Sequence, residues 1–103
     1  MPDTQTSIDL EKVYRHVTDV VCRKVGPESI LVPIRHNVGD LDYIYTLSPV
    51  ATFIWNLLDG TRSLVQIVEA VCNEYDVPND QAATDVAELV SDLSKVSLVL
   101  QVN

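Results

Sequence analysis

Histidine and cysteine are the side chains in this chain best suited to hold a metal ion or act as a nucleophile, and there are two of each: His16, His36, Cys22 and Cys72. No two of them stand at CxxC or other metal-ligand spacing. We therefore expect both cysteines to be reduced and largely buried, since a free cysteine behaves as a small apolar residue, and both histidines to lie on the surface. We expect no bound metal.

Motifs for catalysis or phosphate binding are also missing from the sequence. It contains no glycine-rich phosphate loop, no nucleophile elbow and no paired-carboxylate motif. The whole chain has three glycines, which leaves little scope for a backbone cradle around a phosphate. The sequence therefore predicts a protein that is not an enzyme and that uses no cofactor.

The charge of the chain argues against a nucleic-acid partner. The formal net charge is −8, and binding to a phosphate backbone needs Lys and Arg to displace counterions. The last predicted helix, which would enter the groove of DNA in a winged helix-turn-helix protein, carries four acidic residues and one Lys. A duplex would repel it. A plain alternative for this acidic face is that it keeps the protein soluble.

The length of the chain fits one domain spanning residues 1–103, with a single modest core. Residues 1–7 are polar and are expected to form a disordered tail. No stretch approaches the roughly 20 apolar residues of a membrane span, and the N-terminus lacks the features of a secretion signal. We therefore expect a cytoplasmic protein with no membrane partner.

Three strands are expected in the first half of the chain, at residues 20–25, 29–35 and 42–47. The first two are rich in branched apolar residues and are separated by Gly26-Pro27-Glu28, a plausible hairpin turn. In the third, apolar and polar residues alternate, and the odd-numbered side chains, including Tyr45 and Leu47, are expected to point inward.

Three helices and a short strand are expected in the second half. Ser48 followed by Pro49 is a typical helix start, and Asp59-Gly60 ends that helix. Ser63 and Gln66 fit a capping box before a helix over residues 64–74. After a turn at 76–80, a longer helix has an apolar stripe, and residues 98–102 form a terminal strand. The order predicts an α+β, winged helix-turn-helix-like fold with an N-terminal three-stranded antiparallel sheet.

Several segments resemble the PqqD family, which includes pyrroloquinoline quinone (PQQ) biosynthesis protein D and related recognition elements for the leaders of ribosomally made, post-translationally modified peptides (RiPPs). The resemblance rests on SILVPIR, on IYTLSPVATFIWNLLDGTRSLVQIVEAVCNEYDV and on DVAELVSDLSKVSLV, and it covers about residues 20–99. The family usually has Asn where this chain has Ser48, and Gly where it has Ser97.

The resemblance implies a non-catalytic adaptor. It would bind the leader of a precursor peptide as an added strand and present it to a modifying enzyme, commonly a radical S-adenosylmethionine enzyme. An edge strand suits this role because its free N–H and C=O groups can pair with an extended peptide. The alternative is a structural or regulatory module that self-associates through the same edge, as a homodimer.

The expected peptide-binding residues come from the third strand and from one flank of the long helix. The main-chain N–H and C=O groups of the strand are expected to pair with the peptide. The rings of Tyr43 and Tyr45 are expected either to line the floor of the peptide-binding groove beside the long helix or to pack in the core. The helix flank with carboxylates is favoured over the flank with Ala83 and Ala87, because opposite charge would steer a leader containing Lys or Arg. The predicted site residues are Asp42, Tyr43, Ile44, Tyr45, Thr46, Asp85, Leu89 and Asp92.

Overall fold

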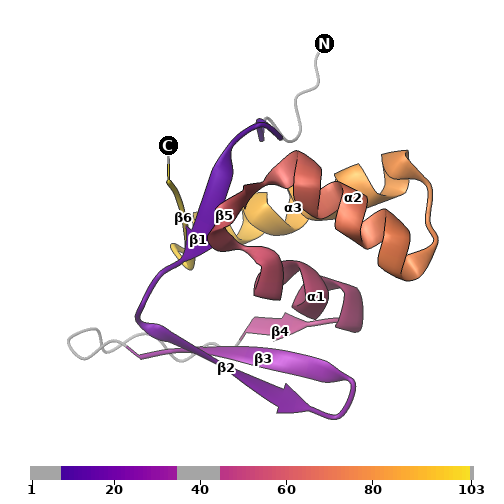
Figure 1. The fold of residues 1–103 in the computed structure, drawn as a ribbon. Coiled ribbons are helices and arrows are strands. Elements are labelled where there is room, and N and C mark those ends of the chain that lie inside the picture. Colours follow the sequence, from indigo (N-terminus) through magenta and orange to yellow (C-terminus); the bar gives the residue numbers. More distant parts are fainter. Residues whose placement is uncertain (1–7, 35–44, 103) are drawn as a thin grey trace.

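The computed structural model describes residues 8–34 and 45–102 of the chain. Its helices and strands follow the order β1 (Val13–His16), β2 (Val20–Val25), β3 (Glu28–Pro33), β4 (Tyr45–Leu47), α1 (Pro49–Leu57), β5 (Asp59–Ser63), α2 (Leu64–Tyr75), α3 (Asn79–Lys95) and β6 (Val99–Gln101). Figure 1 shows one sheet, β2-β3-β4, at the bottom of the view with α1 above it, and a second sheet, β5-β1-β6, on the far side of α1. The predicted α+β class is confirmed.

The sheet β2-β3-β4 is the predicted N-terminal three-stranded antiparallel sheet. β2 pairs with β3 from Val20↔Pro33 to Val25↔Glu28, and Gly26 in the connecting turn has a φ of 67°, a conformation that suits a residue without a side chain. β4 pairs with β3 on the other side. Tyr45 is half-buried, Thr46 exposed and Leu47 buried, so the expected inward face is confirmed for the part of this strand that is described.

The caps of the first two helices are those that the sequence predicts. The Ser48 hydroxyl accepts a hydrogen bond from the Ala51 amide at 3.1 Å, with Pro49 in the first turn. At Ser63 both bonds of the capping box are present: Ser63 Oγ accepts from the Gln66 amide, and Gln66 Oε1 accepts from the Ser63 amide. Because each cap satisfies amides that a helix cannot pair internally, both starts are fixed by local sequence.

α3 ends in a left-handed residue that is not glycine. Ser97 has a φ of 63°; its amide donates to the Ser94 carbonyl at 3.0 Å, and the Leu98 amide donates to the Leu93 carbonyl at 2.9 Å. These two bonds form a Schellman motif, in which glycine is the preferred residue at the left-handed position. Leu93 and Leu98 are fully buried, so the core holds this end in place.

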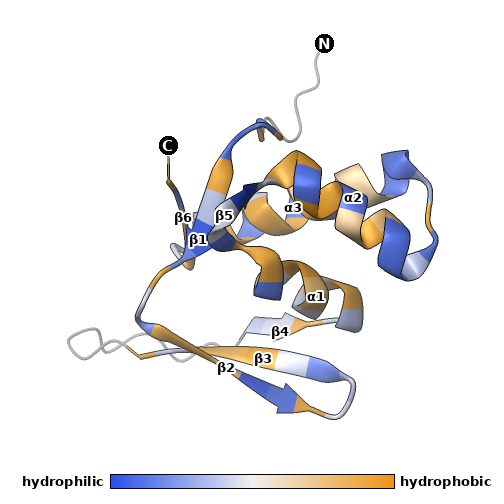
Figure 2. Cartoon of the chain, in the orientation of Figure 1, coloured by the Kyte–Doolittle hydropathy of each residue, from blue (hydrophilic) through white to orange (hydrophobic). Residues whose placement is uncertain are grey.

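The hydrophobic core lies between the helices and the inner faces of both sheets, where Figure 2 shows the orange sides of the helices turned toward one another. The β2-β3-β4 sheet contributes Leu31 and Leu47, and α1 contributes Ile54 and Trp55. The rest of the buried apolar side chains are Tyr14, Leu58, Leu64, Ile67, Val68, Val71, Ala82, Val86, Val90, Leu93, Leu98 and Val99. This core fixes α1 and α3 relative to β4.

Of the second sheet, β5-β1-β6, the sequence predicts one strand. The terminal strand β6 is confirmed, but β1 and β5 were not predicted. β1 runs between the two, with Tyr14↔Gln101 on one side and Val13↔Ser63 on the other. β5 occupies a polar stretch that reads as a helix end and a loop, and Gly60 within it has a φ of 87°.

Two further expectations are wrong, and two lie outside the described residues. Cys22 is exposed on β2, an outer strand whose partner in the described sheet is β3, whereas Cys72 is partly buried; both are free thiols. His16 is part of β1 and is half-buried instead of lying on the surface. The expected tail over residues 1–7 and the expected surface position of His36 fall outside the part of the chain that is described.

Candidate functional site

β4 forms one edge of the sheet β2-β3-β4. It pairs with β3 through Leu31↔Tyr45, Ile30↔Thr46 and Ser29↔Leu47, and within residues 8–34 and 45–102 no strand pairs with its other side. An edge strand presents unpaired N–H and C=O groups on that side, which can hydrogen-bond to another extended chain. Leu47 is 1% exposed, so its side chain anchors β4 in the core. The outer N–H and C=O groups of β4 have no partner strand among the described residues.

A groove of about 410 Å³ lies between α1 and α3. α1 is the element that follows β4 in the chain. The start of α1 supplies one wall with Ser48, Val50, Ala51 and Ile54, and α3 supplies the other with Asp85, Glu88, Leu89 and Asp92. Three- and four-residue spacings relate the α3 residues, from Asp85 to Glu88 and Leu89 and from these to Asp92, which places them on one stripe of the helix. The lining therefore combines apolar side chains from both helices with a row of carboxylates along α3.

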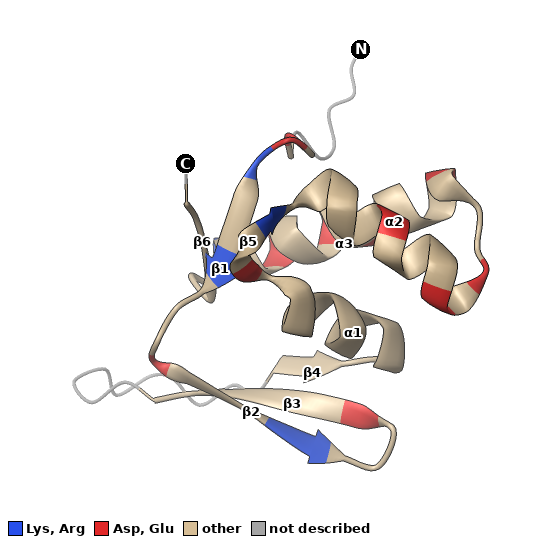
Figure 3. Ribbon diagram, viewed as in Figure 1, with Lys and Arg blue, Asp and Glu red and all other residues tan. Residues whose placement is uncertain are grey.

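The groove is negatively charged. Three of its eight lining residues are acidic and none is basic. The start of α1 contributes a helix dipole, equivalent to roughly half a positive charge, which offsets only a small part of three carboxylates. Figure 3 shows red segments along α2 and α3, and blue segments on β1, β2 and β5; the basic residue of α3 is Lys95, in its last turn. A cation is therefore favoured over an anion here.

Tyr45 links the edge strand to this groove. Burial raises the pKa of its hydroxyl above the ordinary range, and the negative charge of Asp92 raises this pKa further. That electrostatic coupling places the Tyr45 side chain near the carboxylate end of the α3 stripe. The strand also leads directly into the groove, because Ser48, which follows Leu47 in the chain, is one of the lining residues.

The structure brings together part of the predicted site. Asp85, Leu89 and Asp92 line the groove, Tyr45 lies near Asp92, and the side chain of Thr46 is exposed on β4. The remaining predicted residues, Asp42, Tyr43 and Ile44, lie outside the described part of the chain. The other flank of α3 does not line the groove, and its Val90 is fully buried.

Five lining residues were missed: Ser48, Val50, Ala51, Ile54 and Glu88. A signal was available for Glu88, which stands three residues after Asp85 and so shares its helical stripe. The α1 residues carry no comparable signal, because only the packing of α1 against α3 brings them to the groove.

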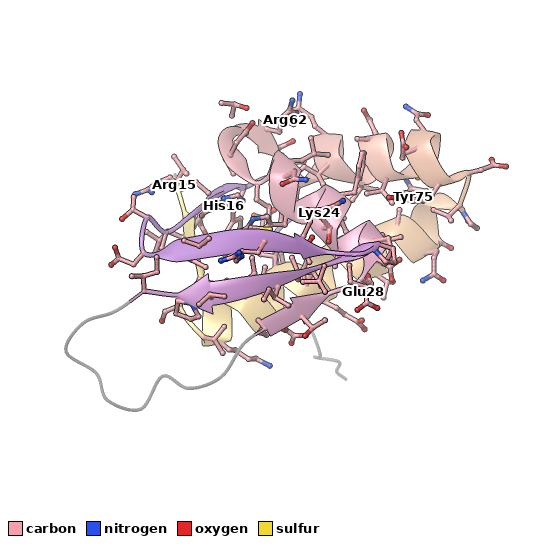
Figure 4. The ribbon with its side chains drawn as sticks, turned by 90° about the horizontal axis from the view of Figure 1, so that it is seen from below. Arg15, His16, Lys24, Glu28, Arg62 and Tyr75 are labelled. Atoms are coloured by element: carbon pink, nitrogen blue, oxygen red, sulfur yellow. The ribbon has the colours of Figure 1, made fainter. Side chains whose placement is uncertain are left out.

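A second polar arrangement involves His16 of β1 and Trp55 of α1, and Figure 4 labels His16. The two rings are stacked, with centroids 3.6 Å apart and 7° between their planes, and His16 Nε2 is hydrogen-bonded to the Trp55 carbonyl oxygen. Burial lowers the pKa of His16, although this hydrogen bond and the charge of Asp59 oppose the shift. The ring joins β1 to α1 as a structural contact.

The described residues contain no group of three or more His, Cys, Asp or Glu side chains that could hold a metal ion. Among the helices of that same part of the chain, none is long and apolar enough to cross a bilayer.

Comparison with known proteins gives one family match and two solved structures with a similar fold. The family model of coenzyme PQQ synthesis protein D (PqqD) matches residues 28–99, which include β3, β4 and all three helices. The chain belongs to the PqqD family. A search of curated proteins found no match. The match begins at residue 28, so β1 and β2 of this PqqD-family chain lie before the matched region.

Two solved structures have a similar fold. One is described as TbiB1 in complex with the TbiA(beta) leader peptide; it is 24% identical, has a TM-score of 0.68, and the match covers 82% of this chain and 93% of that one. The other is lasso peptide synthetase B1 complexed with the leader peptide, with 21% identity, a TM-score of 0.69, and coverage of 84% and 96%. At these identities the likeness shows the shared fold.

Proposed function

We propose that this PqqD-family chain is a non-catalytic adaptor that binds the leader of a ribosomally made precursor peptide and presents it to a modifying enzyme in the cytoplasm. The leader would add as a fourth strand beside β4, with its inward side chains over the groove between α1 and α3. The observation that carries this proposal is the open edge of β4 next to a groove with an apolar floor.

Strand addition suits a substrate whose sequence is read only in part. Main-chain hydrogen bonds to β4 supply affinity for any extended segment, while the groove selects side chains at alternate positions. The two structures with a similar fold, those of TbiB1 and lasso peptide synthetase B1, are both complexes with leader peptides, which supports a leader peptide as the ligand here. The enzyme that would receive the bound leader is proposed from family membership, with a radical S-adenosylmethionine enzyme as the first candidate.

The net charge of −8 makes nucleic acid an improbable partner on electrostatic grounds. Along the sequence from α2 to the end of α3, seven residues are acidic and only Lys95 is basic. We therefore propose a polypeptide as the ligand.

The test is a titration with overlapping synthetic peptides taken from the short reading frames that neighbour the gene. Binding is followed by calorimetry and by ¹⁵N NMR of the labelled protein. One peptide should bind and shift the amides of Tyr45, Thr46 and Leu47 together with Leu89 of the groove. Binding that shifts amides only on the β5-β1-β6 sheet would contradict the proposal.

Light scattering after size-exclusion chromatography distinguishes the adaptor from a module that self-associates through β4. The adaptor should be a monomer whose β4 amides shift only when peptide is added. A homodimer that dissociates neither on dilution nor on peptide addition, with β4 amides protected from hydrogen exchange, would favour self-association instead.

A further inference from the structure

The groove has both an apolar lining and a row of carboxylates, and one type of side chain can contact both. Its lower part is apolar: Ile54 is 1% exposed, and Val50, Ala51 and Leu89 are partly buried. Its rim carries the carboxylates of Asp85, Glu88 and Asp92. Lys and Arg have an apolar stem and a cationic head, and they commonly lay the stem on apolar surface while the head reaches polar groups.

The carboxylates of the rim are available to a ligand. Within residues 8–34 and 45–102, the only ion pair joins Arg62 to Asp59 at 2.7 Å, away from the groove. Asp85 accepts a hydrogen bond from Gln81 Nε2 at 3.0 Å, a neutral donor that leaves its charge uncompensated. An incoming cation would therefore meet three negative charges and, among the described residues, would displace no cation.

Strand geometry limits where the cation can stand in the peptide. A strand added to β4 turns every second side chain toward the groove, and these inward side chains are roughly 6.6 Å apart. Asp85 and Asp92 are seven residues apart on α3, about 10.5 Å along the helix axis. Two successive inward side chains fit within this length, one on the apolar floor and the other beside the carboxylates.

We propose that the groove selects an extended peptide segment in which a Lys or Arg stands two residues from a bulky apolar side chain. The inference rests on the proposed leader-binding function and adds to it the chemistry that the leader must have. The apolar side chain packs on Ile54 and Leu89, and the cationic head lies among Asp85, Glu88 and Asp92.

The test uses a displayed library of random 12-residue peptides, selected separately against three forms of the protein. The first is the unchanged chain. The second carries Asp85→Asn, Glu88→Gln and Asp92→Asn in the groove. The third is a charge-matched control with Glu11→Gln, Glu69→Gln and Glu74→Gln, which are exposed and lie outside the groove.

The unchanged and control proteins should both enrich peptides with Lys or Arg two residues from a bulky apolar residue, and the groove variant should lose this preference. Replacing that Lys by norleucine in a selected peptide should weaken calorimetric affinity by roughly tenfold, an effect that falls as salt is raised. The peptide change leaves the protein intact, so a folding defect in the variant cannot imitate the result.

Two other outcomes separate the inference from the function on which it rests. Selected peptides that shift the β4 amides but show no preference for a cation would overturn the inference and leave leader binding standing. Selected peptides that never shift the β4 amides would overturn both.

Discussion

Replacing Ser97 by glycine should stabilise the protein, because this residue holds a left-handed conformation at the end of α3. Its φ is 63°, and it completes a Schellman motif with bonds from its own amide to Ser94 and from Leu98 to Leu93. An L-residue with a side chain is disfavoured in this conformation by about 1–2 kcal/mol, whereas glycine adopts it freely.

The expected gain is smaller than that conformational cost. Glycine also increases the freedom of the unfolded chain, which opposes folding by roughly 0.5–1 kcal/mol. The net increase in the free energy of unfolding for Ser97→Gly is therefore about 0.7 kcal/mol. For a domain of this size such a change corresponds to a rise in Tm of about 3–6 °C.

Urea unfolding followed by circular dichroism measures this difference, with two controls. Ser97→Ala removes the hydroxyl but keeps the conformational cost, so the gap between the Ala and Gly variants isolates the backbone effect. Ser94→Gly places glycine inside α3, where it should lower stability by roughly 0.5 kcal/mol. A Ser97→Gly protein no more stable than Ser97→Ala would refute the reasoning.

Three more measurements test the structure. Asp92→Asn should lower the pKa of Tyr45 toward its ordinary range, because Asp92 raises it; ¹³C NMR of the tyrosine rings reports the shift, and an unchanged pKa would place Asp92 elsewhere. Burial lowers the pKa of His16 in the folded protein, so the unfolded chain binds the proton at a higher pH, and the free energy of unfolding should fall below about pH 6.5. The variant His16→Gln should lose part of this pH dependence between pH 7.5 and 5.5, and an unchanged slope of unfolding free energy against pH would contradict the assignment. Leu31→Ala should cost about 2–5 kcal/mol in urea unfolding, because this side chain is fully buried under α1, and a loss below 1 kcal/mol would show that the sheet is loosely packed.

The features that sequence reasoning predicts well are those set by neighbouring residues. Ser48 with Pro49, and Ser63 with Gln66, determine helix starts through hydrogen bonds that span three residues. The stripe of α3 follows from helical periodicity in the same way. The predicted site residues on α3 therefore fall on one groove even though the prediction contained no information about α1.

The features that it missed depend on partners far away in the chain. β5 is a polar stretch with Asp59-Gly60, where the Asp59 carboxylate accepts hydrogen bonds from the amide and hydroxyl of Thr61, which is turn chemistry. It is nevertheless a strand because β1 pairs with it. The burial of His16 has the same origin, since Trp55 is 39 residues away.

The arrangement of core and edge suits the proposed binding of an extended peptide by so small a domain. Leu47 and Leu31 are fully or almost fully buried and hold β4 against the sheet, while Val86, Val90 and Leu93 hold α3 against the core. Both walls of the site are therefore ordered before any ligand arrives. Binding then orders mainly the ligand, which limits the entropy lost on association. In the proposed mode, a leader is held by a few backbone hydrogen bonds and one selected pair of side chains, which suits an adaptor that has to release its substrate.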